Sequence, residues 1–100
     1  MAITVNRERG GSFIRLDGAI TIASAAELKT ALLEGLSTGG LHLDLEEVRE
    51  IDVAGLQLVW AAARHAESTD RPIVTRFSKA VEETARNAGF PRFPGEAQTE

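Results

Sequence analysis

Apolar side chains recur along this chain at two spacings, and the spacing predicts where strands and helices form. Residues 3–5 and 12–17 alternate apolar and polar side chains around a glycine pair, which predicts an antiparallel hairpin. Residues 41–45 alternate strictly between leucine and polar side chains, the pattern of a strand with one buried face. Residues 72–75 begin with a proline, continue with β-branched side chains and predict one more short strand.

Three other segments repeat their apolar side chains every three or four residues, which is typical of helices with one buried face. The first is predicted to begin at Ser24, whose spacing to Glu27 fits a capping box. The second is predicted to begin after Asp52 and the third after Ser78, each as the helix cap, with Gly89 ending the third. The apolar stripes are Leu28, Ala31, Leu32 and Leu36; Leu56, Val59, Trp60 and Ala63; and Val81, Ala85 and Ala88.

The predicted order of elements is β-β-α-β-α-β-α. Strands that alternate with helices indicate an α/β fold, here a mixed sheet of four or five strands with helices packed mainly on one face. Gly18 is expected to end the second strand, and the charged residues 46–50 are expected to form a connection. We place the domain at residues 1–90 and expect residues 91–100 to form a flexible C-terminal tail.

Composition narrows the classes of function. The 100 residues suit one domain, and the absence of cysteine excludes disulfides, thiolate catalysis and cysteine-ligated metals. The net charge is -4 with both signs mixed along the chain, so we expect no nucleic-acid partner. No signal-peptide pattern and no apolar run of about 18 residues occurs, which predicts a cytoplasmic protein without direct membrane insertion.

No motif in the sequence indicates catalysis. There is no serine in a Gly-x-Ser-x-Gly elbow, no Walker phosphate loop and no suggestive pair of carboxylates. His42 and His65 lie on different predicted elements, without the spacing of metal ligands. We therefore expect a protein that is not an enzyme and that binds no metal and no cofactor.

A family pattern runs through the middle of the chain, and its segments follow one another in a fixed order. They are residues 18–21 (Gly-Ala-Ile-Thr), 26–28 (Ala-Glu-Leu), 43–45 (Leu-Asp-Leu), Val48 and 51–56 (Ile-Asp-Val-Ala-Gly-Leu). In this order they resemble a STAS domain, the fold of anti-sigma factor antagonists, stressosome subunits and the STAS subunits of some lipid transporters. The resemblance covers roughly residues 3–90 and is strongest from Leu41 to Leu58.

The resemblance implies a binding module, and the chain departs from the family pattern at three positions. Phosphorylatable members carry a serine just before the glycine, which a partner anti-sigma kinase modifies, whereas Ala54 has no hydroxyl. Val53 replaces a frequent serine or threonine, and Thr21 stands where several antagonists have an acidic residue. The chain is therefore more similar to the non-phosphorylated, solitary STAS proteins, and we expect docking without a phosphoswitch at position 54.

The partner surface is expected to combine the 20–24 loop, the 52–55 loop and the second helix. Its candidate partner-binding residues are Thr21, Ser24, Asp52, Val53, Ala54, Gly55, Gln57 and Trp60. Trp60 is expected in the core, or at the interface if it is exposed beside the loops.

The protein partner is expected to be an anti-sigma factor or related kinase, a chemotaxis-type signalling protein or a transporter ATPase, and a homodimer is also considered. The alternative functions are a regulatory subunit of a lipid-transport ATPase, or an antagonist that is switched at another hydroxyl such as Ser24 or Thr21.

Overall fold

A hairpin begins the fold, in a computed structural model that describes residues 1–96. Strand β1 (Ala2–Glu8) is followed by a turn at Gly10, whose φ of 84° favours glycine, and returns as β2 (Gly11–Ile20). The two strands pair antiparallel, with Ile3 opposite Leu16. The predicted N-terminal hairpin is confirmed.

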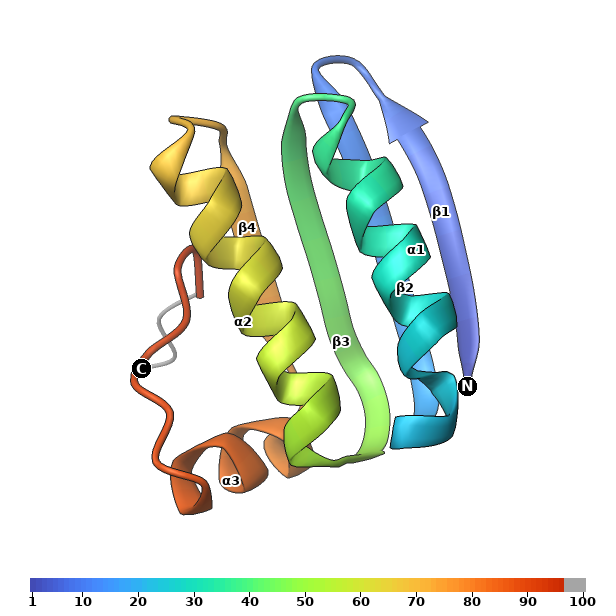
Figure 1. The fold of residues 1–100 in the computed structure, drawn as a ribbon, viewed down its shortest axis with the longest axis vertical. Coiled ribbons are helices and arrows are strands. Elements are labelled where there is room, and N and C mark those ends of the chain that lie inside the picture. The colour runs from blue at the N-terminus through green and yellow to red at the C-terminus, as the bar shows by residue number, and fades with distance from the viewer. Residues whose placement is uncertain (97–100) are drawn as a thin grey trace.

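Helices and parallel strands alternate after the hairpin (Figure 1). The elements are α1 (Ala25–Leu36), β3 (Gly40–Ile51), α2 (Val53–Ser68), β4 (Ile73–Phe77) and α3 (Lys79–Asn87). The sheet has the order β1-β2-β3-β4, and β2, β3 and β4 run parallel. The predicted order of elements and the mixed sheet are confirmed.

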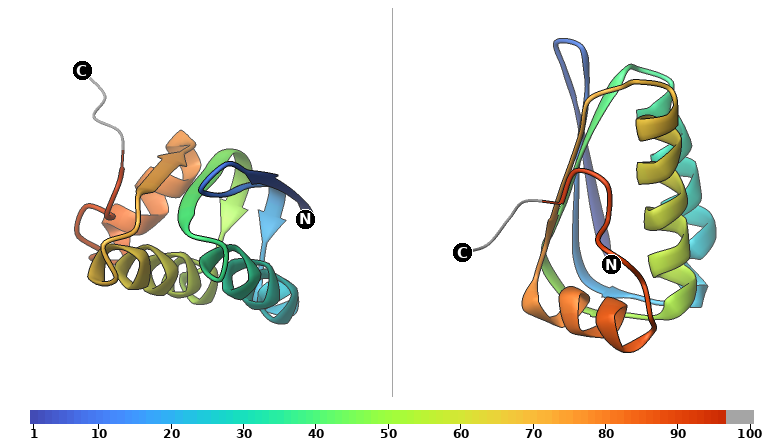
Figure 2. Two further views of the ribbon diagram at one scale, coloured as in Figure 1. Left: turned by 90° about the horizontal axis from the view of Figure 1, so that it is seen from above. Right: turned by 90° about the vertical axis from the view of Figure 1, so that its left-hand side faces the viewer.

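The core lies between the sheet and one layer of helices. Figure 2 shows α1 and α2 side by side on one face, with α3 across the end of the sheet. Inward-facing side chains of β2 and β3 meet the apolar stripes of α1 and α2, and Leu43 and Leu56 are fully buried. The helices cover one face of the sheet, and on the other face Arg15 and Glu47 form an ion pair with a nitrogen–oxygen distance of 3.6 Å.

Strands β2 and β3 are longer than the sequence analysis predicted. Gly18 does not end β2, because its φ of 80° accompanies a shift in the pairing register and the strand continues to Ile20. The expected connection at residues 46–50 is wrong, since these residues lie within β3. Their apolar member, Val48, is buried at 1% exposure, and the four charged side chains around it are exposed. Both strands therefore extend together to the lower end of the molecule.

The chain remains packed beyond the boundary that we placed at residue 90. Gly89, with a φ of 85°, ends α3 as predicted, and the Phe90 amide donates to the Ala85 carbonyl at 3.0 Å. Phe93 is 2% exposed, with its ring centroid 4.8 Å from that of Phe77. Aromatic burial therefore extends the packed domain past residue 90, and residues 97–100 of the expected flexible tail lie outside the described residues.

The helices of the described chain are short. The longest, α2, has 16 residues, and none within residues 1–96 is long and apolar enough to cross a membrane.

Leu43→Ala and Leu56→Ala test the position of the core. Each removes a fully buried side chain, so each is expected to lower the free energy of unfolding by about 2–5 kcal/mol. Leu33→Ala is the matched control, because Leu33 is 57% exposed and its loss should change stability by less than about 0.5 kcal/mol. Urea denaturation measures all three, and losses under about 1 kcal/mol at both buried leucines would contradict this core.

Phe93→Ala tests whether the segment after residue 90 belongs to the fold. Deleting this buried ring is expected to cost about 3–5 kcal/mol of stability. It should also change the fluorescence of Trp60, the single tryptophan, whose ring centroid lies 5.0 Å from that of Phe93. Pro91→Ala, at an exposed position two residues earlier, is the control. If Phe93→Ala were as stable as the control, the tail that the sequence predicted would be the better description.

Candidate functional site

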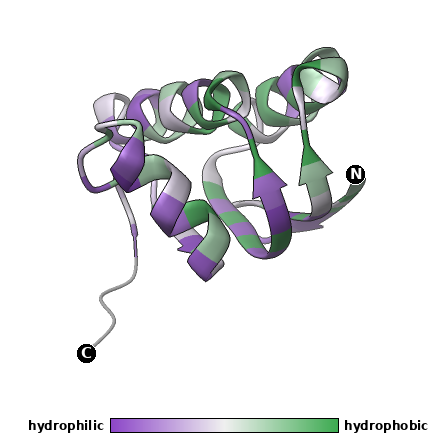
Figure 3. Cartoon of the chain, turned by 90° about the horizontal axis from the view of Figure 1, so that it is seen from below, coloured by the Kyte–Doolittle hydropathy of each residue, from purple (hydrophilic) through white to green (hydrophobic). Residues whose placement is uncertain are grey.

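Two turns meet where the parallel strands β2 and β3 end. Ile20 and Ile51 are register partners at these ends, and the Asp52 amide donates to the Ile20 carbonyl at 3.1 Å. The 21–24 turn and the 52–55 turn are thereby held next to each other at the lower end of the molecule in Figure 1. Figure 3 looks onto this end and shows the tips of the two strands coloured hydrophobic. Parallel strands often place functional loops at this edge of a sheet.

The turn from β2 to α1 is a single 3₁₀ turn, Ile22–Ser24. The Ser24 amide closes it by donating to the Thr21 carbonyl at 2.8 Å. The predicted capping box at Ser24 is wrong, because Ser24 already has helical φ and ψ of −96° and −2° and its side chain makes no capping hydrogen bond. A capping residue needs extended backbone angles to direct its oxygen at the next amides. The Ser24 hydroxyl therefore has no capping role.

The turn from β3 to α2 is capped as predicted. Asp52 has extended φ and ψ of −93° and 173°, and its Oδ1 accepts a hydrogen bond from the Gly55 amide at 2.9 Å. A carboxylate there also interacts favourably with the positive end of the helix dipole. The Asp52 carboxylate is thus held at the start of α2 by its role in the fold.

Gly55 lies beneath this turn rather than on the surface. It is buried, and a Cβ at this position would lie 2.8 Å from Ile20 Cγ2 and 3.1 Å from Ile51 Cγ1. A larger residue would push α2 away from the paired strand ends. The glycine therefore supports the site from within, although it was predicted as a partner-binding residue.

The surface above this support is apolar. Ile22 is 74% exposed and Val53 is 46% exposed, one on each turn. Ala54 is half-buried beside Val53, and Gln57 is exposed one helical turn further along α2. We call the surface made by Thr21, Ile22, Ser24, Asp52, Val53, Ala54 and Gln57 the strand-end surface. Ile22 was missing from the predicted set, because an isoleucine before a helix reads from sequence as a core residue.

Trp60 lies apart from the two turns. Its ring meets Phe90 and Phe93 edge-on, at centroid distances of 6.0 and 5.0 Å. The Arg64 guanidinium lies over its face at 5.7 Å. These contacts place Trp60 against the C-terminal segment, which Figure 1 shows on the side of α2 that faces away from α1. The structure places Trp60 away from the two turns of the predicted set, about one helical turn beyond Gln57 on α2.

The side chains of the strand-end surface are suited to contact with another protein. Within residues 1–96, no three side chains of the histidine, aspartate and glutamate types come close enough to hold a metal ion. His42 and His65 lie on β3 and α2, with no third such group beside either among the described residues. What the surface presents is exposed apolar area next to one capped carboxylate, an arrangement suited to protein contact.

Comparisons with known proteins agree on the fold. An anti-sigma factor antagonist from Mycobacterium paratuberculosis has a TM-score of 0.76 at 20% identity, covering 93% of this chain and 85% of that one. The unphosphorylated anti-sigma factor antagonist SpoIIAA has a TM-score of 0.70 at 19% identity, covering 97% and 89%. The phosphorylated Bacillus cell fate determinant SpoIIAA has a TM-score of 0.65 at 19% identity, covering 97% and 92%. At these low identities, the TM-scores show a shared fold.

A comparison of the sequence with protein families identifies the family. No curated protein matches the chain. A family model described as "Mlab, STAS domain" matches residues 3–94. Since this match spans nearly the whole chain, the protein belongs to the STAS domain family.

Proposed function

We propose that this protein is a non-enzymatic, cytoplasmic interaction module that docks on a signalling protein through the strand-end surface. The observation that carries the proposal is the exposure of Ile22 and Val53 on neighbouring turns at the ends of β2 and β3. Exposed apolar side chains that the fold itself does not need are a common mark of a binding surface. The family and its relatives with solved structures, two of them described as anti-sigma factor antagonists, support an anti-sigma factor or related kinase as the partner.

In this proposal docking is not switched at position 54. Residues 52–57 contain no hydroxyl side chain, so no phosphoester can form in the turn or the first residues of α2. A phosphate in such a surface acts by like-charge repulsion and by its desolvation cost. With alanine and valine there, the surface is cheap to desolvate and stays available. Control of binding then rests with the partner.

Ser24 supports a second candidate, an antagonist that is switched at another hydroxyl. Its side chain makes no capping bond, lies on the strand-end surface and is half-buried. A phosphate at Ser24 would place its charge beside the apolar turn residues. The Asp52 carboxylate on the neighbouring turn would repel it, so the modification would alter docking directly.

Val53→Asp and Ala54→Asp test the docking surface once affinity capture and mass spectrometry have identified the partner. A carboxylate buried without a partner in the interface should weaken binding by about 1–3 kcal/mol, measured by calorimetry. The fold should be retained, because an acidic side chain is tolerated in the first turn of a helix. Val74→Asp is the matched control, since Val74 is 37% exposed and lies on the outer face of the sheet.

Equal affinity of all three variants and the native chain, with intact thermal melts, would show that the partner docks elsewhere. Capture of a transporter ATPase in place of a signalling protein would favour the alternative of a lipid-transport regulator.

Phosphopeptide mapping of the protein from its native cell separates the two candidates. The main proposal expects no phosphate at Thr21 or Ser24, because docking is permanently available. Stoichiometric phosphate at either residue would restore a switch at this surface. If the phosphate is at Ser24, Ser24→Ala should abolish it, whereas Ser37→Ala, at an exposed serine beyond the other end of α1, should leave it unchanged.

A further inference from the structure

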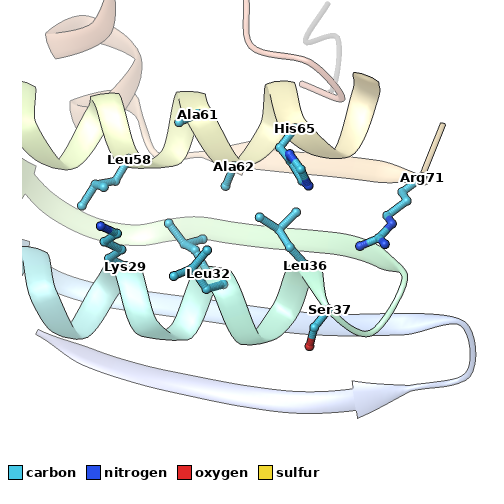
Figure 4. Close-up of a pocket in the computed structure, with 10 residues that line it drawn as sticks. Lys29, Leu32, Leu36, Ser37, Leu58, Ala61, Ala62, His65 and Arg71 are labelled. Carbon is cyan, nitrogen blue, oxygen red and sulfur yellow. The ribbon is translucent and has the colours of Figure 1, made fainter. Parts of the chain in front are cut away.

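A second surface lies along the outer side of the helical layer. The groove between α1 and α2 has a volume of about 480 Å³. Its apolar lining includes Leu32 and Leu36 of α1 and Leu58 and Ala62 of α2 (Figure 4). Leu33, at its edge, is 57% exposed although it belongs to the same helix face. An apolar groove of this size, open along its length, is a site for another molecule.

The groove has basic groups at both ends. Figure 4 shows Lys29 at one end and Arg71 with His65 at the other, with the leucines between them. No carboxylate lines the groove, although acidic residues outnumber basic ones by 15 to 11 in the chain. Within residues 1–96 neither Lys29 nor Arg71 forms an ion pair. The charge of the groove is therefore complementary to an acidic occupant.

The shape of the groove selects the kind of occupant. Its lining runs from Lys29 on α1 to Ser37, the residue that caps this helix, and from Leu58 to His65 on α2, about 12 and 10 Å at the rise of a helix. Both walls are helices, whose backbone groups are already bonded within them and offer no edge for strand pairing. A peptide that binds in this groove must therefore form its backbone hydrogen bonds within itself, as a helix does. A fatty acid has one headgroup and would leave the far basic end unmatched.

We propose that the α1–α2 groove binds an amphipathic helix of a partner protein, with apolar side chains on one face and carboxylates at both ends of that face. Apolar residues at positions i, i+3, i+4 and i+7 span two turns, which matches the length of the groove. The carboxylates pair with Lys29 and with Arg71. This docking site goes beyond the proposed function, because no residue that lines the groove belongs to the strand-end surface.

Two synthetic peptides of about 15 residues, a length that permits helicity, test the proposal. Both carry leucine at i, i+3, i+4 and i+7; one has glutamates flanking this face, and the other has lysines in their place. Calorimetry and amide chemical shifts of the 100-residue chain report binding and its location. The acidic peptide is expected to bind with shifts along α1 and α2, and the basic peptide about tenfold more weakly or not at all.

Variants of the protein locate the contact. Ala61→Glu places a carboxylate in the groove at an exposed helix position, and Lys29→Glu reverses the charge at one end. Each should weaken binding of the acidic peptide about tenfold or more. Lys79→Glu is the matched control, because Lys79 is the only other lysine, is exposed and lies on α3 outside the groove. Val53→Asp, on the strand-end surface, should leave peptide binding unchanged, so the two proposals fail separately.

Three outcomes would overturn this inference. One is equal binding of the acidic and basic peptides, or no binding of either at millimolar concentration. Another is a set of shifts confined to the strand-end surface. The third is binding of sodium dodecanoate in the groove without binding of the acidic peptide, which would assign the groove to a small anionic amphiphile.

Discussion

The parallel pairing of β2 and β3 up to their last residues holds the two turns of the strand-end surface together. Ile20 and Ile51 end the pair together, and the hydrogen bond from the Asp52 amide to the Ile20 carbonyl carries the pairing one residue further. Gly55 then lets α2 settle directly on the two isoleucines. Without this closure the two turns would be separate loops.

Helix α2 contributes to both proposed binding surfaces, because each of its sides contacts a different part of the molecule. One side is core, with Leu56 and Val59 fully buried. A second side forms the groove with α1, and a third holds Trp60 against the C-terminal segment. Its first turn completes the strand-end surface. A partner that contacted the start of α2 and another that lay along the groove would use different residues of the same helix, so the two surfaces do not overlap.

Local signals in the sequence were enough for the order of elements and for much of the site. The cap at Asp52 could be predicted because it involves only one side chain and the neighbouring backbone. The strand at Leu41–Leu45 could be predicted because its leucines recur at every second position. The cap at Ser24 failed because a 3₁₀ turn replaced the extended residue that the capping box assumes. Residues 46–50 were misjudged because the inward-facing residues change from every second position to Val48 and Ile51, a spacing that bulged pairing with β2 permits. The exposure of Ile22 and the packing of Phe93 depend on contacts between segments that are distant in the sequence. A local sequence pattern does not predict such contacts.

After α3 the chain returns to β4 and lies beside it. The Thr75 amide donates to the Gly95 carbonyl at 2.9 Å, and Glu96 forms a parallel bridge with Thr75, so the outer side of β4 is occupied in part. Strand β1 has β2 on one side and no strand on the other within the described chain. Unpaired strand edges recruit other chains, and proteins limit this by covering or charging them. The molecule is therefore polarised across its width: further β-strand addition is obstructed at β4 and open at β1, where Arg7 and Glu8 place charge at the exposed end of the strand.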